Sequence, residues 1–320
     1  MRIFCFTGVL FSKVYICKVK LKNYRKGFES YIKFERSMAL NTAEAYLRDF
    51  DKFTQYLHQN DLDPPPDQVS EQLIGQFIQS LFELGISARS QARIISGLKA
   101  FYKYLLLEDI VEQDPTALIE GPKIGLKLPE VLSIEEIDRL IKAIDLSSKE
   151  GERNRAIIET LYSCGLRVSE LVELKISNIL FDESFILVKG KGNKERLVPI
   201  GKAALKYIQY YCERQRNHQT MKKNAEDTLF LNNRGGALSR IMIYTIIQKL
   251  AEKSGLKKKI SPHTFRHSFA THLVDGGADL RAIQEMLGHE SITTTEIYTH
   301  LDRQYLREAM VQFHPRNQMK

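Results

Sequence analysis

Apolar residues recur every three or four positions along most of this chain, which is the spacing of one face of a helix. Asn41 and Glu44 have the spacing of a capping box that would begin the first long helix. Ser70 and Ser87 are typical N-caps for two further helices. The apolar faces of the first and last of these helices are Tyr46, Phe50, Phe53 and Leu57, and Ile94, Leu98, Phe101 and Leu105. Together with the helical pattern that already begins at Tyr24, these three helices predict a four-helix domain over 22–112.

Proline and glycine interrupt the helical pattern over 113–132, as is typical of a linker between domains. A second capping box begins at Ser133, and helical spacing resumes over 133–320. Within that region, two short segments of β character, 185–188 and 196–200, flank a glycine-rich turn. The sequence thus predicts a mainly α protein, in which a second, α+β domain carries one small antiparallel hairpin.

The first 21 residues are apolar and basic, but they lack the basic start and small-residue cleavage site of a secretory signal. We interpret 1–21 as a poorly packed N-terminal extension, or as a start codon assigned too far upstream. No apolar run reaches the roughly 18 to 20 residues that a membrane-spanning helix needs. The four cysteines have no C-x-x-C spacing, which fits a reducing compartment. We expect a cytoplasmic protein with no membrane partner.

Basic residues are concentrated in the second half of the chain. Residues 1–126 hold 16 Lys and Arg against 15 Asp and Glu, whereas residues 127–320 hold 31 against 24. An excess of this kind makes a polyanion such as nucleic acid a candidate partner of the second domain, although many basic proteins bind none.

The glycine-rich turn does not have the spacing of a nucleotide-binding loop, because Gly190 and Gly192 lead into a strand and not into a helix. The basic residues of the hairpin are Lys189, Lys191, Lys194 and Arg196. They form either a solvated turn or a hairpin pressed against phosphates, with one lysine delivered to a reacting oxygen.

Three histidines fall within ten residues at His263, His267 and His272, but their spacing does not match a zinc motif. On a helix that begins near Pro262, His263 and Arg266 share a face. A guanidinium fork beside an imidazole suits a phosphate, since the first binds two oxygens and the second carries a proton. A capping histidine and a surface arginine are the structural alternative.

Three weaker signals use the same side-chain types. Arg167 lies at a predicted helix start, just after the expected C-cap Gly165. His289 follows a short helix and a glycine, and Tyr298 lies in a threonine-rich, polar stretch. Taken singly, each could be an ordinary surface or packing residue.

In combination, these residues resemble the catalytic set of the tyrosine recombinases, the integrase family. The set is Arg167, Lys191, His263, Arg266, His289 and Tyr298. The segments around them carry the same resemblance: GLRVSEL, GKGNKERLVP, SPHTFRHSFATHLVDGGADLRAIQEMLGHESITTTEIYTH and the terminal His314-Pro315-Arg316. Within the family the chain is most similar to the Xer recombinases that resolve chromosome dimers, and its C-terminal segment resembles the XerC-like partner more than the XerD-like one.

The resemblance implies a transesterification that needs no metal ion, ATP or other cofactor. Tyr298 would attack the phosphorus and form a 3′-phosphotyrosyl link, with His263 as the base and Lys191 as the acid for the leaving 5′-oxygen. The groups that would stabilise the phosphate are Arg167, Arg266 and His289. Glu170 would support Arg167 or the local helix, or else be an exposed helix carboxylate.

The resemblance also implies a SAM-like core-binding domain and a catalytic domain that close as a C-shaped clamp on double-stranded DNA. Four protomers would assemble as a heterotetramer with a homologous partner recombinase, activated by a septal DNA translocase. The tail residues Leu301, Leu306, Met310 and Val311 would dock on a neighbour or pack on their own core. The alternatives are a phage or mobile-element integrase, a type IB topoisomerase-like strand transferase, and a DNA-binding accessory protein with an inactive site.

Overall fold

The computed structural model describes residues 20–125, 130–190, 194–288 and 300–318. The chain divides into two compact units, Met1–Leu126 and Lys127–Lys320. Residues 1–19 of the predicted N-terminal extension lie outside the described residues.

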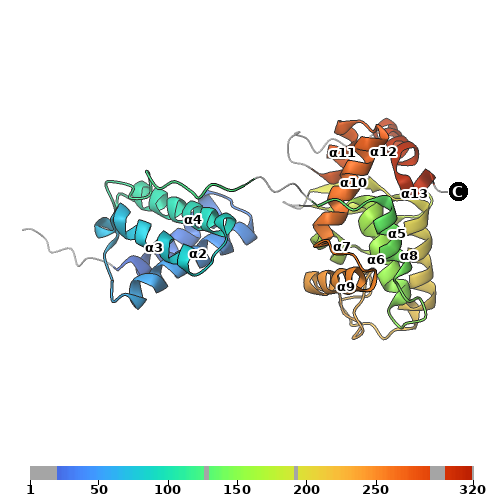
Figure 1. Ribbon diagram of the computed structural model, residues 1–320, viewed down its shortest axis with the longest axis horizontal. Coiled ribbons are helices and arrows are strands. Elements are labelled where there is room, and N and C mark those ends of the chain that lie inside the picture. Colours follow the sequence, from blue (N-terminus) through green and yellow to red (C-terminus); the bar gives the residue numbers. More distant parts are fainter. Residues whose placement is uncertain (1–19, 126–129, 191–193, 289–299, 319–320) are drawn as a thin grey trace, which may run out of the picture. The chain divides into compact units, whose positions relative to one another are not determined.

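The first unit is built from helices packed around aromatic side chains. Its elements are η1 (Leu21–Tyr24), α1 (Arg25–Ser30), η2 (Tyr31–Glu35), α2 (Leu40–Gln59), η3 (Pro66–Gln68), α3 (Glu71–Glu83) and α4 (Ala88–Leu107). Helices α2 and α4 pack against each other, and α3 contacts α4 (Figure 1). The ring centroids of Phe50 and Phe101 lie 4.6 Å apart, and Phe28 meets Phe101 edge-on at 5.3 Å. The apolar faces predicted for α2 and α4 therefore form the core of this unit.

Two of the three predicted caps in this unit are confirmed. The hydroxyl of Ser70 accepts from the backbone N–H of Leu73, and that of Ser87 accepts from Ser90. The predicted cap at Asn41 is wrong, because α2 begins one residue earlier and Asn41 lies inside its exposed first turn. The residue before α2 is Ala39, whose side chain makes no cap, so water can satisfy the free N–H groups of that turn.

The second unit combines helices with one small sheet. Its helices are α5 (Ile134–Lys142), α6 (Gly151–Cys164), α7 (Val168–Val172), η4 (Ile176–Asn178), α8 (Lys202–Arg214), η6 (Arg216–His218), α9 (Arg240–Lys253), α10 (Pro262–Gly276), α11 (Leu280–Leu287), α12 (His300–Phe313) and α13 (Pro315–Gln318). Helices α6 and α8 lie side by side, with α11 and α12 at one end of the unit and α9 at the other (Figure 1). The predicted mainly helical fold class is confirmed.

The sheet has three antiparallel strands in the order β1 (Ile179–Leu180), β2 (Phe185–Lys189) and β3 (Glu195–Pro199). Phe185 pairs with Pro199 and Lys189 with Glu195, so the predicted hairpin is confirmed. Alternate side chains face opposite sides of the sheet. Ile186 and Val198 face the main core of the unit, whereas Phe185 and Leu197 join the side chains of α10, α11 and α12. The hairpin is thus held from both sides.

The start of the second unit is fixed to α10. The predicted capping box of α5 is confirmed, since Ser133 and Glu136 exchange both hydrogen bonds. Just before it, the backbone N–H of Leu132 donates to Ser268 Oγ at 2.9 Å, and this hydroxyl donates to the carbonyl of Thr264. The end of the predicted linker is therefore tied to the helix that carries His263.

The C-terminal helix α12 packs on its own unit. Leu306 and Met310 are buried among side chains of α10, α11 and the sheet, whereas Val311 is exposed. The expectation that Leu306 and Met310 dock on a neighbouring protomer is therefore wrong, because both side chains fill the core of their own chain. The Leu301 side chain lies outside the described residues.

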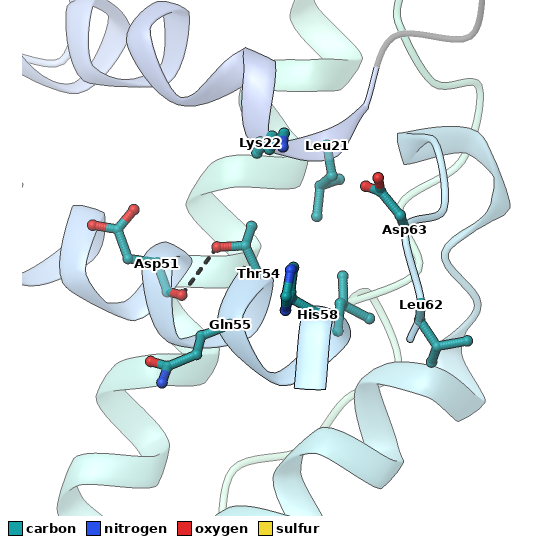
Figure 2. A pocket seen from close by; sticks show the side chains of 9 residues that line it. Leu21, Lys22, Asp51, Thr54, Gln55, His58, Leu62 and Asp63 are labelled. Atoms are coloured by element: carbon teal, nitrogen blue, oxygen red, sulfur yellow. Dashed lines mark hydrogen bonds between the residues drawn. The ribbon is translucent and has the colours of Figure 1, made fainter. Parts of the chain in front are cut away.

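No helix in the described part of the chain is long and apolar enough to cross a membrane. The first unit has a shallow cavity of about 300 Å³ between η1 and the end of α2 (Figure 2). In it, the hydroxyl of Thr54 donates to the backbone carbonyl of Asp51 at 3.0 Å. The candidate catalytic residues all belong to the other unit, Lys127–Lys320.

Candidate active site

Three of the six candidate residues, Arg167, His263 and Arg266, lie within the described structure. The other three, Lys191, His289 and Tyr298, lie outside the described residues. The first three come from the start of α7 and the first turns of α10. Residues roughly 100 positions apart in the sequence are thereby brought to one place.

Arg167 is positioned by the sharp end of α6. That helix ends at Gly165, which takes the left-handed conformation with φ +57°. A Cβ at Gly165 would lie 2.5 Å from Phe269 Cδ1 on α10, so the close approach of α6 and α10 requires glycine here. The chain then turns into α7 at Arg167, whose backbone N–H donates to Glu170 Oε2 at 2.8 Å. The prediction of a glycine C-cap followed by a helix start is confirmed.

Glu170 is not the exposed carboxylate of the structural alternative, because only 4% of it is exposed. Its Oε1 accepts from Arg167 Nη1 at 2.9 Å and from Arg196 Nη1 at 2.8 Å. Its Oε2 accepts from Arg196 Nη2 at 2.9 Å. Burial would raise the pKa of Glu170, but the hydrogen bonds and charges of the two arginines outweigh it and lower this pKa. Glu170 is therefore an anion that holds two guanidinium groups.

Arg266 is buried, and two backbone carbonyls hold its guanidinium. Nη1 donates to Gly165 O at 2.9 Å and Nη2 donates to Leu287 O at 2.6 Å. Burial, and then the charge of nearby Arg167, lower the pKa of Arg266 to about 10. It stays charged at neutral pH, so the structural alternative of a surface arginine is wrong. Two adjacent cations in one place form a site for an anion.

Arg167 and Arg266 meet at the C-terminal end of α11. Arg167 Nη2 donates to Gly288 O at 3.0 Å, next to the Leu287 carbonyl that binds Arg266. The Arg167 side chain is 36% exposed, so it keeps N–H groups that can reach a ligand. The candidate residue His289 follows Gly288 directly in the sequence.

His263 is exposed on the first turn of α10. Partial burial, and then the charges of His267, Arg266 and Arg167, lower the pKa of His263 below its ordinary value of 6.5. The imidazole is therefore mainly neutral at pH 7, which is the form that accepts a proton. His263 can act as a base beside the two arginines.

The other histidines of the motif have different surroundings. His267 is exposed one turn after His263. His272 lies 2.8 Å from the Tyr162 hydroxyl through Nδ1, with the rings packed edge-on. Among the residues that the structure describes, no three His, Cys, Asp or Glu side chains are grouped as a metal site would require.

The role of Arg196 was not predicted from the sequence, where it was grouped with the lysines of the hairpin as part of a solvated turn or of a phosphate contact. Lys189 and Lys194 are exposed, but Arg196 is only 6% exposed. The backbone N–H of Gly190 donates to Lys194 O at 2.8 Å and closes the hairpin before its tip. The signal that could have identified Arg196 is its place in the apolar strand β3, where a buried charge requires a partner.

The second unit and the first each match a family model. The model of the phage integrase family matches residues 130–305, and that of the phage integrase N-terminal SAM-like domain matches residues 26–109. The tyrosine recombinase XerD of Chlorobaculum tepidum is 44% identical over 292 residues, or 90% of this chain and 95% of that protein. XerD of Staphylococcus epidermidis is 42% identical over 287 residues, or 90% of this chain and 97% of that protein.

A solved structure of a Xer recombinase is also similar to this chain. The XerH site-specific recombinase, in a post-cleavage complex with a palindromic difH substrate, is 27% identical with a TM-score of 0.67. The similarity covers 90% of this chain and 84% of that one. The chain belongs to the phage integrase family. It is a tyrosine recombinase of the Xer type, an enzyme that cuts and rejoins DNA strands. The resemblance of its C-terminal segment to the XerC-like partner stays a prediction.

Proposed function

We propose that this enzyme recombines duplex DNA at a specific site, with Tyr298 as the nucleophile, and resolves chromosome dimers in the cytoplasm before cell division. The observation that supports it most is the paired attachment of Arg167 and Arg266 to one helix end, beside the neutral base His263. Fixed guanidinium groups suit the charge that develops on a phosphate during transfer.

In the proposed reaction the Tyr298 oxygen attacks the scissile phosphorus and the bond to the 5′-oxygen breaks. His263 takes the phenol proton, since a phenol with an ordinary pKa of about 10 is a poor nucleophile at neutral pH. Lys191 donates a proton to the leaving 5′-oxygen. Arg167, Arg266 and His289 bind the non-bridging oxygens. Attack by a 5′-hydroxyl of a partner strand reverses each step and restores Tyr298, so no bond energy is lost to water.

The proposed partners are double-stranded DNA, a homologous recombinase in a heterotetramer and a septal DNA translocase. The XerH structure in complex with its difH substrate supports the first of these partners. Residues 127–320 contain 31 basic and 24 acidic residues, and this excess of positive charge favours the binding of a polyanion such as DNA.

A covalent-trapping assay tests this function. The protein is incubated in EDTA with a nicked duplex that carries a chromosome-terminus recombination site, with and without the partner recombinase, and is then run on a denaturing gel. We expect a slow protein–DNA band that is absent in Tyr298→Phe. The matched control is Tyr305→Phe, which removes a hydroxyl that donates to Asp279 at the start of α11 and should keep the band.

Each result has a defined meaning. Site-dependent trapping supports a recombinase, whereas equal trapping on unrelated duplexes indicates a type IB topoisomerase-like activity. Preference for the attachment site of a mobile element indicates an integrase. A band that survives in Tyr298→Phe contradicts the assigned nucleophile. Tight binding by wild-type protein and partner without a band indicates an accessory role.

A further inference from the structure

Three consecutive backbone carbonyls at the end of α11 each accept a hydrogen bond from a different arginine. The pairs are Arg196 Nε to Met286 O at 2.9 Å, Arg266 Nη2 to Leu287 O at 2.6 Å and Arg167 Nη2 to Gly288 O at 3.0 Å. The last carbonyls of a helix have no partners within it and carry its partial negative charge. The end of α11 therefore acts as one fixed acceptor surface for cations that come from three other elements.

Helix α11 is well suited to hold these arginines in place. Its first turn is capped by Asp279, whose carboxylate accepts from the N–H groups of Arg281 and Ala282. Its buried face includes Ile283 and Met286, which pack in the core shared with α10 and α12. A rigid helix end sets the position of every guanidinium bound to it.

Arg196 differs from the other two arginines in the direction of its guanidinium. Nη1 and Nη2 both donate to the buried carboxylate of Glu170, and Nε donates to Met286 O. Because its fork is directed at Glu170 and only 6% of the residue is exposed, Arg196 is not placed as a phosphate ligand. It links Glu170, which also holds Arg167, to the helix end that holds Arg167 and Arg266.

The packing around Arg196 leaves no spare room. Gly288 has φ +64°, and a Cβ at this position would lie 3.0 Å from Arg196 Cδ and 3.1 Å from its Nε. Glycine is therefore required both for the left-handed turn and for the close passage of this side chain. A methyl group at Gly288 would press on Arg196 without removing any of its donors.

We infer that Arg196 is a positioning residue for the strand-transfer reaction. It fixes Glu170 relative to the end of α11, and it thereby fixes the positions of Arg167 and Arg266, the two arginines proposed to bind the phosphate. This inference rests on the proposed function. A lysine cannot replace Arg196, because one ammonium group cannot donate to Met286 O and to both oxygens of Glu170 in the same geometry.

The test measures the single-turnover rate of covalent complex formation, the Kd for the duplex and the thermal midpoint of the full-length protein. The variants are Arg196→Lys, Arg196→Met and Gly288→Ala. We expect the rate of the variants to fall by about 100-fold, because a displacement of about 1 Å at a reacting centre has an effect of that size. The Kd for the duplex should equal that of the wild type. The matched control is Arg153→Lys, at a buried arginine that donates to Leu231 O and lies outside the network. This control should lose stability but keep the cleavage rate.

A second substrate separates a positioning role from a general loss of structure. A methylphosphonate at the scissile position removes the charge that Arg167 and Arg266 neutralise. The deficit of the Arg196 variants should therefore be much smaller on this substrate than on the phosphate. An unstable fold would lower both rates equally.

The outcomes distinguish this inference from the proposed function. If the wild-type protein forms no covalent complex, the proposed function fails. If it does, and folded Arg196→Lys or Arg196→Met cleaves at the wild-type rate, only the positioning role is overturned. An equal deficit on both substrates also overturns it. If Arg196→Met does not fold, Arg196→Lys decides the question, since it keeps most of the packed side chain.

Discussion

Glu170 and Arg196 form a buried ion pair with two parallel hydrogen bonds, of 2.8 Å from Nη1 to Oε1 and 2.9 Å from Nη2 to Oε2. Both residues are less than one-tenth exposed, and they come from α7 and β3. Oε1 also accepts a hydrogen bond from Arg167, so a single carboxylate is hydrogen-bonded to two guanidinium groups. The positions of both guanidinium groups at the candidate active site therefore depend on one buried carboxylate.

The first prediction concerns Glu170→Gln, which keeps the shape of the side chain and removes its charge. Loss of one partner of a buried ion pair costs about 3 kcal/mol, because the remaining charge stays buried without compensation. Urea denaturation should show that decrease in the free energy of unfolding. The control is Glu173→Gln, at an exposed position just after the same helix, with an expected change within about 0.5 kcal/mol. Equal stability of the two variants would contradict the prediction.

The second prediction compares two glycines with positive φ. Gly255 has φ +69° and has no atom within 4 Å of where a Cβ would lie, so Gly255→Ala should cost about 1 kcal/mol from backbone strain alone. Gly165→Ala adds a clash with Phe269 at 2.5 Å and should cost about 3 kcal/mol in total. It should also slow cleavage, because Gly165 O anchors Arg266. Chemical denaturation of both variants checks the difference, and similar losses would show that the close contact relaxes.

The third prediction concerns the pH dependence of stability. His314 is fully buried between Tyr162 and Phe269, with ring centroids 4.8 and 5.6 Å away. Burial lowers the pKa of His314 to about 3, although the hydrogen bond with Tyr162 O opposes this shift. Below pH 6.5 the unfolded chain binds a proton that the folded chain does not, so stability falls as the pH decreases toward 3.

The contribution of His314 is about 1.4 kcal/mol per pH unit within that window. His314→Gln should be less stable at pH 7 but should have a shallower slope below about pH 6. Unfolding free energies measured from about pH 8 to 4.5 check this, with a constant difference between the two proteins above about pH 7.5 as the internal control. Parallel curves over the whole range would exclude His314 as the source of acid sensitivity.

The fourth prediction concerns the pH dependence of cleavage. If His263 is the base, the rate should decrease as the pH falls through its lowered pKa, with a midpoint below 6.5. His267 contributes to this lowering, so His267→Gln should move the midpoint upward. His218→Gln, at a residue of η6 that does not contribute to the lowered pKa of His263, should leave the midpoint unchanged. Single-turnover rates from about pH 5 to 8 provide the measurement, and an unshifted midpoint in His267→Gln would argue against His263 as the base.

Much of the local structure could be predicted from the sequence. The caps at Ser70, Ser87 and Ser133 and the β2–β3 hairpin follow from residue types at short spacing, and each is confirmed. The cap at Asn41 was wrong because a favourable spacing does not decide between adjacent start positions when the first turn is exposed.

The surroundings of the charged residues could not be predicted in the same way. Arg196 is a basic residue on the same hairpin as its exposed neighbours, yet it is buried. Its partners Glu170 and Met286 are 26 and 90 residues away. The tail residues Leu306 and Met310 likewise had a correct helical spacing, but only the fold decides that their own core receives them.

Short-range patterns in the sequence are enough to predict the helical periodicity, most helix caps and the set of residues from which the chemistry is drawn. These depend on interactions within a few residues, or on the side chains themselves. The convergence of Arg167, Arg196 and Arg266 on consecutive carbonyls of one helix end depends instead on how distant segments of the chain pack together. A guanidinium is directed by where acceptors lie in space, and the packing of α6, α7, β3, α10 and α11 sets those positions.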